Sequence, residues 1–212
     1  MPDRPTVYGA PYSVYVRAVR LTLEEKGVPY LLVPVDVFAE GGTPADYRTR
    51  HPFGRIPAFE YRGFRLYEAG AISRYVDEAF TGPALQPRSP EHRARVNQVL
   101  SILDAYVYRT LVWDIYVERI SAPKRGRPSD EALIQAALPR AHVCLSALEA
   151  IMGDGPFLAG PTLTLADLHA APMFAYFTTA PEAAALLADH HRLRQWWTLI
   201  GRRASMAATA AP

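Results

Sequence analysis

The order of two short apolar segments around one amphipathic helix limits the fold more than any other feature of this chain. Residues 6–9 are typical of a short strand that ends at a glycine, and residues 30–35 are typical of a second, apolar strand. Between them a helix is predicted from Ser13, at its start, to Gly27, which ends it. A strand, a helix and a strand in this order predict a parallel pair joined by a right-handed crossover.

The sequence up to residue 80 completes a small domain. After a loop with one helical turn, two short strands flank Arg62 and Gly63, a plausible hairpin turn. A helix is expected over residues 70–80, and Pro34 favours an edge position for the second strand. The predicted order β-α-β-α-β-β-α therefore gives a mixed four-stranded sheet.

The rest of the chain predicts helices and no strand. The proline-rich residues 82–90 are typical of a linker. We therefore expect a first domain over residues 1–81 and an all-helical second domain over residues 91–212. Its helices are predicted over residues 91–120, 129–152, 164–179 and 191–203. The third of these begins with a capping box from Thr164 to Asp167.

Composition argues against several classes of function. The net charge of +2 is too small to predict nucleic-acid binding. No apolar run approaches the roughly 18–20 residues that span a bilayer, and the N-terminus does not resemble a signal peptide. The single cysteine, Cys144, excludes an intrachain disulfide and an all-cysteine metal site. We expect a cytoplasmic protein without a metal, a membrane or a nucleic-acid partner.

Residues 51–72 are suited to hold an extended peptide. They predict a loop, a strand entered through a proline, a tight turn, a second strand and the start of a helix. Ile56 would present its backbone N–H and C=O to the ligand, which is strand addition on a very small scale. A cis bond before Pro57 would explain the proline at that position.

Four motifs together resemble the cytosolic glutathione transferase family, nearest its serine-dependent phi and theta-like classes. They are residues 8–17 (strand, loop and serine-capped helix), residues 52–58 (proline loop), residues 66–72 (strand-to-helix turn), and residues 158–160 with 164–167 (helix cap). The resemblance covers essentially the whole chain. It implies a thioredoxin-like N-terminal domain, an all-helical C-terminal domain and usually a homodimer. It also implies glutathione as co-substrate and a hydrophobic electrophile as acceptor.

The resemblance implies a catalytic role for Ser13. A free thiol has a pKa of about 8.5, so little of it is thiolate at neutral pH. A hydroxyl at a helix N-terminus would stabilise the thiolate both by a hydrogen bond and by the helix dipole. From spacing alone, Ser13 is also a plain helix cap. Tyr12 is the second candidate for the catalytic hydroxyl, and Arg17, one turn later, either supports the site electrostatically or only decorates the helix.

The resemblance also implies the residues that hold glutathione. Arg55 would contact the ligand backbone or form a salt bridge elsewhere, Ile56 and Pro57 would read the cysteinyl backbone, and Glu68 would face the γ-glutamyl amine. At the next position the family usually has serine, and this chain has Ala69. The helix N-terminus would still bind a carboxylate there, without the hydroxyl.

A second departure lies at Gly41 and Gly42, where related enzymes often carry basic residues for the glycyl carboxylate. Both ends of the ligand are therefore expected to be held less firmly. The aromatic side chains expected to line the second-substrate pocket are Tyr12, Phe38, Tyr106 and Trp113.

Three functions are compatible with these residues. The first is a glutathione transferase that conjugates the thiolate to a hydrophobic electrophile, as in detoxification. The second is a specialised glutathione-dependent isomerase, dehalogenase, lyase or biosynthetic tailoring enzyme. The third is a non-catalytic binding module, which Ala69, Gly41 and Gly42 motivate.

Overall fold

The computed structural model describes residues 3–211, and their contacts divide the chain into two compact units. Unit 1 comprises Met1–Gln86 and Arg203–Pro212, and unit 2 comprises Pro87–Arg202.

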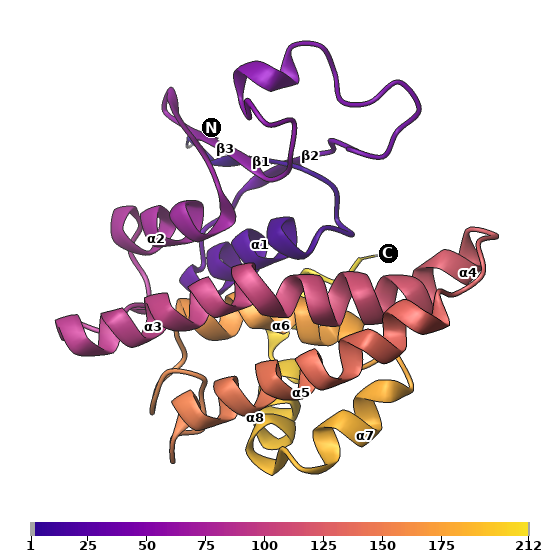
Figure 1. Cartoon of the computed structure of the whole chain (residues 1–212). Helices are drawn as coiled ribbons and strands as arrows, with labels where there is room; N and C mark the ends of the chain where they lie inside the picture. The colour runs from indigo at the N-terminus through magenta and orange to yellow at the C-terminus, as the bar shows by residue number, and fades with distance from the viewer. Residues whose placement is uncertain (1–2, 212) are drawn as a thin grey trace. The chain divides into compact units, whose positions relative to one another are not determined.

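Unit 1 contains the mixed four-stranded sheet that the sequence predicts. Its order is β2-β1-β3-β4, with β1 and β2 parallel and the other neighbours antiparallel. The strands are β1 (Thr6–Tyr8), β2 (Leu31–Val33), β3 (Ala58–Tyr61) and β4 (Phe64–Tyr67). Two helices, α1 (Val14–Lys26) and α2 (Ala69–Ala79), lie on one face of the sheet (Figure 1).

The apolar faces of α1 and α2 form the core of unit 1. Val16, Val19 and Leu23 recur along α1 at helical spacing, and all three are fully buried. They share a core cluster with Phe59 of β3 and Ile72 of α2. Burial of this stripe, more than local propensity, holds α1 in place.

Local signals in the sequence account for the connections. Arg62 and Gly63 both have positive φ angles, 51° and 80°, as the tight hairpin turn requires. β2 is an edge strand, as predicted, and it ends at Val33 because Pro34 has no N–H for a ladder. The predicted helical turn before the hairpin is a short 3₁₀ helix, η1 (Tyr47–Thr49).

Parts of the segments assigned to the linker and to the second domain pack in unit 1. The buried Lys26 ammonium pairs with Asp77 at 3.1 Å and also donates to the carbonyl of Pro83. The Asp77 carboxylate accepts from the amide of Leu85, a fully buried residue. These bonds hold the first half of the predicted linker against α1 and α2.

Unit 2 is helical. α3 (Pro90–Ile102) continues without a break into η2 (Leu103–Ser121), a segment with π-type hydrogen bonds, and then into the short α4 (Ala122–Lys124). The predicted second, third and fourth helices are α5 (Glu131–Met152), α6 (Leu165–Phe177) and α8 (His191–Gly201). The sequence did not predict α7 (Glu182–Ala188) or α9 (Ala204–Ala208), and α9 belongs to unit 1. Between residues 3 and 211, no helix has both the length and the apolar character to cross a membrane.

Candidate functional site

One row of the sheet in unit 1 brings the predicted site segments together. Tyr8, Ala58 and Tyr67 are direct neighbours across β1, β3 and β4, and Val33 of β2 pairs with Tyr8. β1, β2 and β4 end at this row, and β3 begins there. The segments that leave the sheet at this edge carry the following predicted site residues: Tyr12, Ser13, Phe38, Arg55, Ile56, Pro57, Glu68 and Ala69. The topology thus places together residues that are far apart in the sequence.

Gly9 allows two of these segments to approach closely. A Cβ at Gly9 would lie 2.3 Å from Val16 Cγ2 and 3.3 Å from Ile56 Cβ. Only a residue without a side chain fits between the first turn of α1 and the loop before β3. Ile56 therefore lies beside the turn that Ser13 begins.

Ser13 is the N-cap of α1. Its backbone is extended, with φ −74° and ψ 127°, and its Oγ accepts a hydrogen bond from Val16 N at 3.4 Å. A hydroxyl has one proton to donate and two lone pairs to accept. Since the described bond uses a lone pair, the Ser13 proton can be donated to an anion at the positive end of the helix.

The Tyr12 hydroxyl already forms a hydrogen bond within unit 1. It donates to Asp36 Oδ1 at 2.5 Å, and the same oxygen accepts from Phe38 N at 2.8 Å. The rings of Tyr12 and Phe38 lie 5.9 Å apart. This arrangement favours Tyr12 as part of an aromatic wall over Tyr12 as the donor to a thiolate.

Arg17 connects α1 to the C-terminal helix. Its Nε donates to Thr209 Oγ1 at 3.3 Å, and a terminal nitrogen donates to the carbonyl of Met206 at 3.0 Å. Arg20 donates in the same way to the carbonyl of Thr209 at 3.1 Å. Since the last carbonyls of a helix lack partners within it, these two arginines hold α9 in unit 1. No local pattern around Arg17 or Arg20 predicts this contact.

The loop before β3 has the predicted cis bond between Ile56 and Pro57. Tyr47 Oη donates to the carbonyl of Arg55 at 2.9 Å, and this bond holds the loop in place. Burial raises the pKa of Tyr47 to about 12, so this hydroxyl stays a donor at neutral pH. The Arg55 side chain is exposed.

Glu68 has an unusual backbone conformation at the start of α2. Its φ of 70° and ψ of 114° are rare for a residue with a side chain. Its carbonyl accepts the first helical bond, from Ile72 N at 2.9 Å. Ala69, the first residue of α2, is buried. Strained backbone is common where a protein positions a ligand, and here it turns an exposed carboxylate out beside a helix N-terminus.

Gly41 and Gly42 have a conformational reason for being glycine. Their φ angles are 90° and 76°, and Gly42 N donates to the carbonyl of Ala39 at 2.9 Å in a tight turn. Side chains at these positions would strain the backbone. A basic residue at either of these two positions would therefore strain the backbone of the loop.

His51 is a buried residue of this region that the sequence-based predictions missed. Its ring lies 4.9 Å from that of Tyr67 and 6.2 Å from that of Phe53. Burial lowers the pKa of His51, and the nearby Glu68 carboxylate partly opposes this shift. Its position directly before the Pro-Phe-Gly motif was the only signal for it.

The remaining predicted site residues lie in unit 2. Tyr106 is 63% exposed and Trp113 is 36% exposed, and both are on η2. Their place in a pocket with Tyr12 and Phe38 stays a prediction. Burial raises the pKa of the Cys144 thiol, which keeps it protonated and unreactive. Among residues 3–211, no group of acidic, histidine and cysteine side chains is arranged to hold a metal ion.

Comparison with known proteins agrees with this geometry over the whole chain. Residues 7–84 match the model of the glutathione S-transferase N-terminal domain, and residues 71–203 match that of the C-terminal domain. Glutathione S-transferase F10 of Arabidopsis thaliana is 31% identical over 97% of this chain and 96% of its own length.

Two solved structures are also similar to this chain. Glutathione transferase F7 from Populus trichocarpa has a TM-score of 0.85 at 29% identity and covers 97% of each chain. Glutathione S-transferase I from maize, in complex with an atrazine glutathione conjugate, has a TM-score of 0.86 at 26% identity, over 98% of this chain and 97% of that one.

Proposed function

The chain belongs to the glutathione S-transferase family, and we propose that Ser13 is the residue with which it stabilises the thiolate of glutathione. Its activity is the conjugation of glutathione, the co-substrate, to hydrophobic electrophiles. The observation that carries the proposal for Ser13 is the shared sheet edge, which places the start of α1 beside Ile56.

The chemistry requires the thiol to lose its proton. Lowering a thiol pKa by about 2 units corresponds to roughly 2.7 kcal/mol of preferential stabilisation of the thiolate. The Ser13 hydroxyl supplies a hydrogen bond to the charged sulfur, and the α1 N-terminus supplies a positive partial charge. No acidic residue lies in the first turn of α1 to oppose this field.

The other predicted residues would orient the tripeptide. The backbone of Ile56 would pair with the cysteinyl residue, with Arg55 and Pro57 beside it. Glu68 would hold the γ-glutamyl amine, and the amides at the start of α2 would hold its carboxylate. The maize relative contains a glutathione conjugate, which supports a site of this chemistry in the present chain.

A standard assay tests the function. Glutathione and a chloronitrobenzene should yield the conjugate in the presence of the protein, followed by the absorbance of the product. A protein that binds glutathione but shows no conjugation with any of a panel of aromatic and alkyl electrophiles would instead favour a binding module.

We propose that Ala69 weakens the hold on the γ-glutamyl carboxylate. Substitution of Ala69 by Ser should tighten glutathione binding by about 10- to 200-fold, because a hydrogen bond to a charged group contributes about 1.5–3 kcal/mol. Titration calorimetry with glutathione measures this directly. Ala71→Ser, in the same first turn of α2, is the matched control and should leave the affinity unchanged. Equal affinities of Ala69→Ser and the natural chain would contradict the proposal.

We propose that the acceptor pocket is lined by Tyr12, Phe38, Tyr106 and Trp113. Tyr12 and Phe38 already form an aromatic pair in unit 1. An aromatic lining favours apolar or aromatic electrophiles.

The buried, protonated Cys144 is compatible with the reducing cytoplasm, where we propose that the protein acts.

We propose that the chain forms a homodimer through Phe53. Among the described residues, Phe53 is the most exposed large apolar side chain, at 68%. Its ring is supported by edge contacts with His51 and Tyr67, at 6.2 and 6.3 Å. A fixed and exposed aromatic ring is typical of an interface anchor, because little conformational entropy is lost on binding.

Substitution of Phe53 by Ser should therefore shift the protein from dimer to monomer. Loss of an aromatic anchor commonly costs 2 kcal/mol or more, about a 30-fold rise in the dissociation constant. Light scattering over a range of concentrations measures the mass. The same substitution at Phe64, which is 48% exposed and lies on the hairpin, should leave the dimer intact. A stable dimer of Phe53→Ser would contradict the assignment.

A further inference from the structure

We propose that neutral His51 is the positioning residue that holds the dimer anchor Phe53, so that protons and glutathione both control dimer formation. The inference rests on the proposed homodimer and on the proposed ligand role of Glu68. His51, Phe53 and Tyr67 form a cluster of three rings in unit 1. The ring centroids lie 4.9 Å apart for His51 and Tyr67, 6.2 Å for His51 and Phe53, and 6.3 Å for Phe53 and Tyr67. Each ring packs on both of the others, so a change at His51 reaches Phe53 directly.

The three rings differ in their exposure. His51 is 2% exposed, whereas Tyr67 is 37% and Phe53 is 68% exposed. The His51 backbone is bonded at both of its polar groups, because its N–H donates to the carbonyl of Tyr47 at 3.1 Å and its carbonyl accepts from Gly54 N at 2.9 Å. The second bond closes a β-turn that contains Phe53. The exposed anchor is therefore carried on a turn whose first residue is buried.

The His51 ring has no acceptor for a second proton. Its Nδ1 is buried and has no hydrogen-bond partner among the described residues. An imidazolium carries a proton on each ring nitrogen, so its Nδ1–H would lack an acceptor and its charge would lack water. Burial accordingly lowers the pKa of His51. Only the neutral ring suits the packed cluster.

Three ionisable groups face His51. Glu68, between β4 and α2, stabilises the imidazolium and partly opposes the effect of burial on the pKa of His51, whereas Arg55, in the loop before β3, adds to that effect. The third group is the phenol of Tyr67, whose ring packs on His51. Glutathione would present its γ-glutamyl ammonium to Glu68 and cancel the support that this carboxylate gives to the imidazolium. The ligand therefore favours the neutral ring, which is the form that holds Phe53.

Dimer formation is thus coupled to the loss of a proton from His51. In the free subunit the loop can rearrange so that a protonated ring reaches water, and Phe53 moves with it. In the dimer the partner would hold Phe53 in place, so the pKa of His51 is lower there than in the free subunit. The dimer is then strongest at a pH above the pKa of the free subunit, and it weakens as the pH falls through that value. Because burial lowers the pKa of His51, the weakening lies below about pH 6.5, where an unperturbed histidine titrates.

Sedimentation equilibrium of the full chain at pH 7.5 and pH 5.5, at equal ionic strength, tests the coupling. If half of His51 is protonated in the free subunit and little in the dimer, each subunit contributes a factor of about two. We therefore expect the dissociation constant to be at least about fourfold higher at pH 5.5. S-methylglutathione, at a concentration that calorimetry shows to be saturating, should reverse most of this rise. A rise that the saturating ligand leaves unchanged would overturn the coupling to glutathione.

Two variants assign the effect to His51. His51→Phe keeps a flat ring in the cluster but cannot take a proton, so its dissociation constant should be the same at both pH values. His51→Gln also cannot take a proton and should behave in the same way, which keeps the test valid if circular dichroism shows one of the two variants to be unfolded. The same pH dependence in the natural chain and in a folded variant would overturn the proposal.

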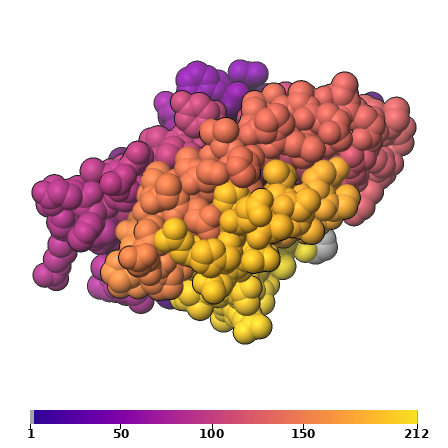
Figure 2. Space-filling model, turned by 60° about the horizontal axis from the view of Figure 1, so that its bottom comes forward, coloured from indigo at the N-terminus to yellow at the C-terminus, as the bar shows by residue number. Residues whose placement is uncertain are grey.

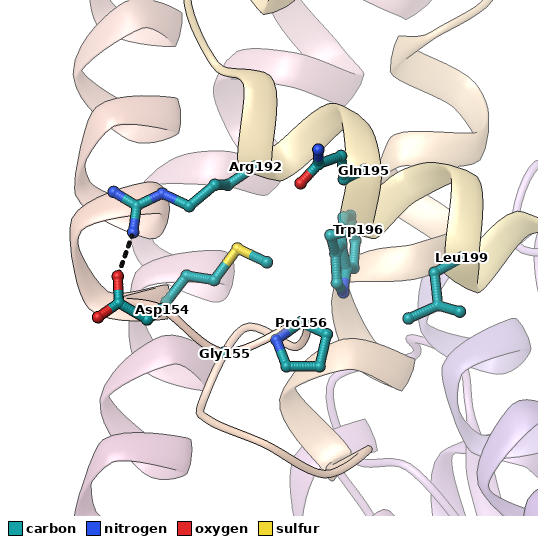
Figure 3. A pocket seen from close by; sticks show the side chains of 8 residues that line it. Asp154, Gly155, Pro156, Arg192, Gln195, Trp196 and Leu199 are labelled. Carbon is teal, nitrogen blue, oxygen red and sulfur yellow. Dashed lines mark ion pairs between the residues drawn. The ribbon is translucent and has the colours of Figure 1, made fainter.

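An exposed histidine of unit 2 provides the matched control. In Figure 2, the yellow segment of α7 and α8 lies at the surface beside the orange segment that follows α5. His191 is the first residue of α8, next to Arg192, which lines a pocket of about 270 Å³ between α8 and the end of α5 (Figure 3). His191→Phe makes the same substitution at this exposed position and should keep the pH dependence of the natural chain.

The outcomes distinguish this inference from the proposals on which it rests. A natural chain that is monomeric at pH 7.5 would contradict the homodimer and overturn the inference with it. A natural dimer whose dissociation constant is the same at both pH values would overturn the inference and leave the homodimer intact. Loss of the pH dependence in His191→Phe, with its retention in His51→Phe, would place the proton on another element and also overturn the role of His51.

Discussion

Replacement of Ser13 by Ala is expected to reduce kcat/KM for glutathione conjugation by about 10- to 200-fold, because it removes one hydrogen bond, of about 1.5–3 kcal/mol, to the developing thiolate. The loss should appear mainly in kcat at neutral pH, since the tripeptide is held by other groups. It should shrink as the pH rises, because hydroxide then deprotonates the thiol without help from the protein. Initial rates with a chloronitrobenzene between pH 6 and 9 measure both effects.

A second N-cap serine serves as a control that distinguishes the loss of a catalytic hydroxyl from the loss of a helix cap. Ser89 begins α3, and its Oγ accepts from His92 N at 3.4 Å, the same distance as in the Ser13 cap. Removal of either cap costs roughly 0.5–2 kcal/mol of stability. Ser89→Ala should lose stability and keep its rate, whereas Ser13→Ala should lose the rate. A similar small loss of rate in both variants would reduce Ser13 to a structural cap.

Replacement of Asp167 by Ala is expected to prevent unit 2 from folding. The Asp167 carboxylate is fully buried at the start of α6. It accepts from the amides of Leu158 and Thr164 at 2.8 Å, from Thr164 Oγ1 at 3.0 Å and from Trp196 Nε1 at 2.9 Å. Each buried donor left without a partner costs about 1–3 kcal/mol. Their sum approaches the 5–15 kcal/mol by which an ordinary domain is stable.

The measurement is urea unfolding followed by circular dichroism and tryptophan fluorescence. Asp167→Asn keeps the shape but turns an NH₂ group toward donors, so it should also lose several kcal/mol. Asp189→Asn makes the same chemical change at an exposed carboxylate of unit 2 and should stay within about 0.5 kcal/mol. If Asp167→Ala unfolded at the same urea concentration as the natural chain, water would have to replace the carboxylate. The capping box would then not stabilise the unit.

The sheet, and the edge of it at which the candidate site segments meet, were predictable because their signals are local. Ser13 before an apolar stripe indicates a helix start, and proline after Ile56 indicates the loop with the cis bond that the structure contains. Arg62-Gly63 fixes the hairpin and hence the register that aligns Ala58 with Tyr67. With β-α-β handedness, these signals suffice to bring the segments that carry the candidate site residues to one edge of the sheet.

The features that were not predicted depend on contacts between distant residues. The hydrogen bond from Tyr12 to Asp36 joins residues 24 positions apart, and no local pattern in either segment predicts it. The C-terminal α9 belongs to unit 1 because Arg17 and Arg20 bind its carbonyls, across more than 180 residues. α7 has Pro181 at its N-cap and an alanine-rich sequence, so it lacks both a polar cap and a periodic apolar face.

Ser13 is the group that we propose stabilises the glutathione thiolate. The most direct measurement is the pKa of the thiol of bound glutathione, from its thiolate absorbance in the ultraviolet as a function of pH. We expect a value well below the free pKa of about 8.5 in the natural chain. In Ser13→Ala the pKa should rise by about 1 to 2 units toward 8.5, because the α1 N-terminus remains but the hydrogen bond of about 1.5–3 kcal/mol is lost. The same lowered pKa in both proteins would contradict this role of Ser13.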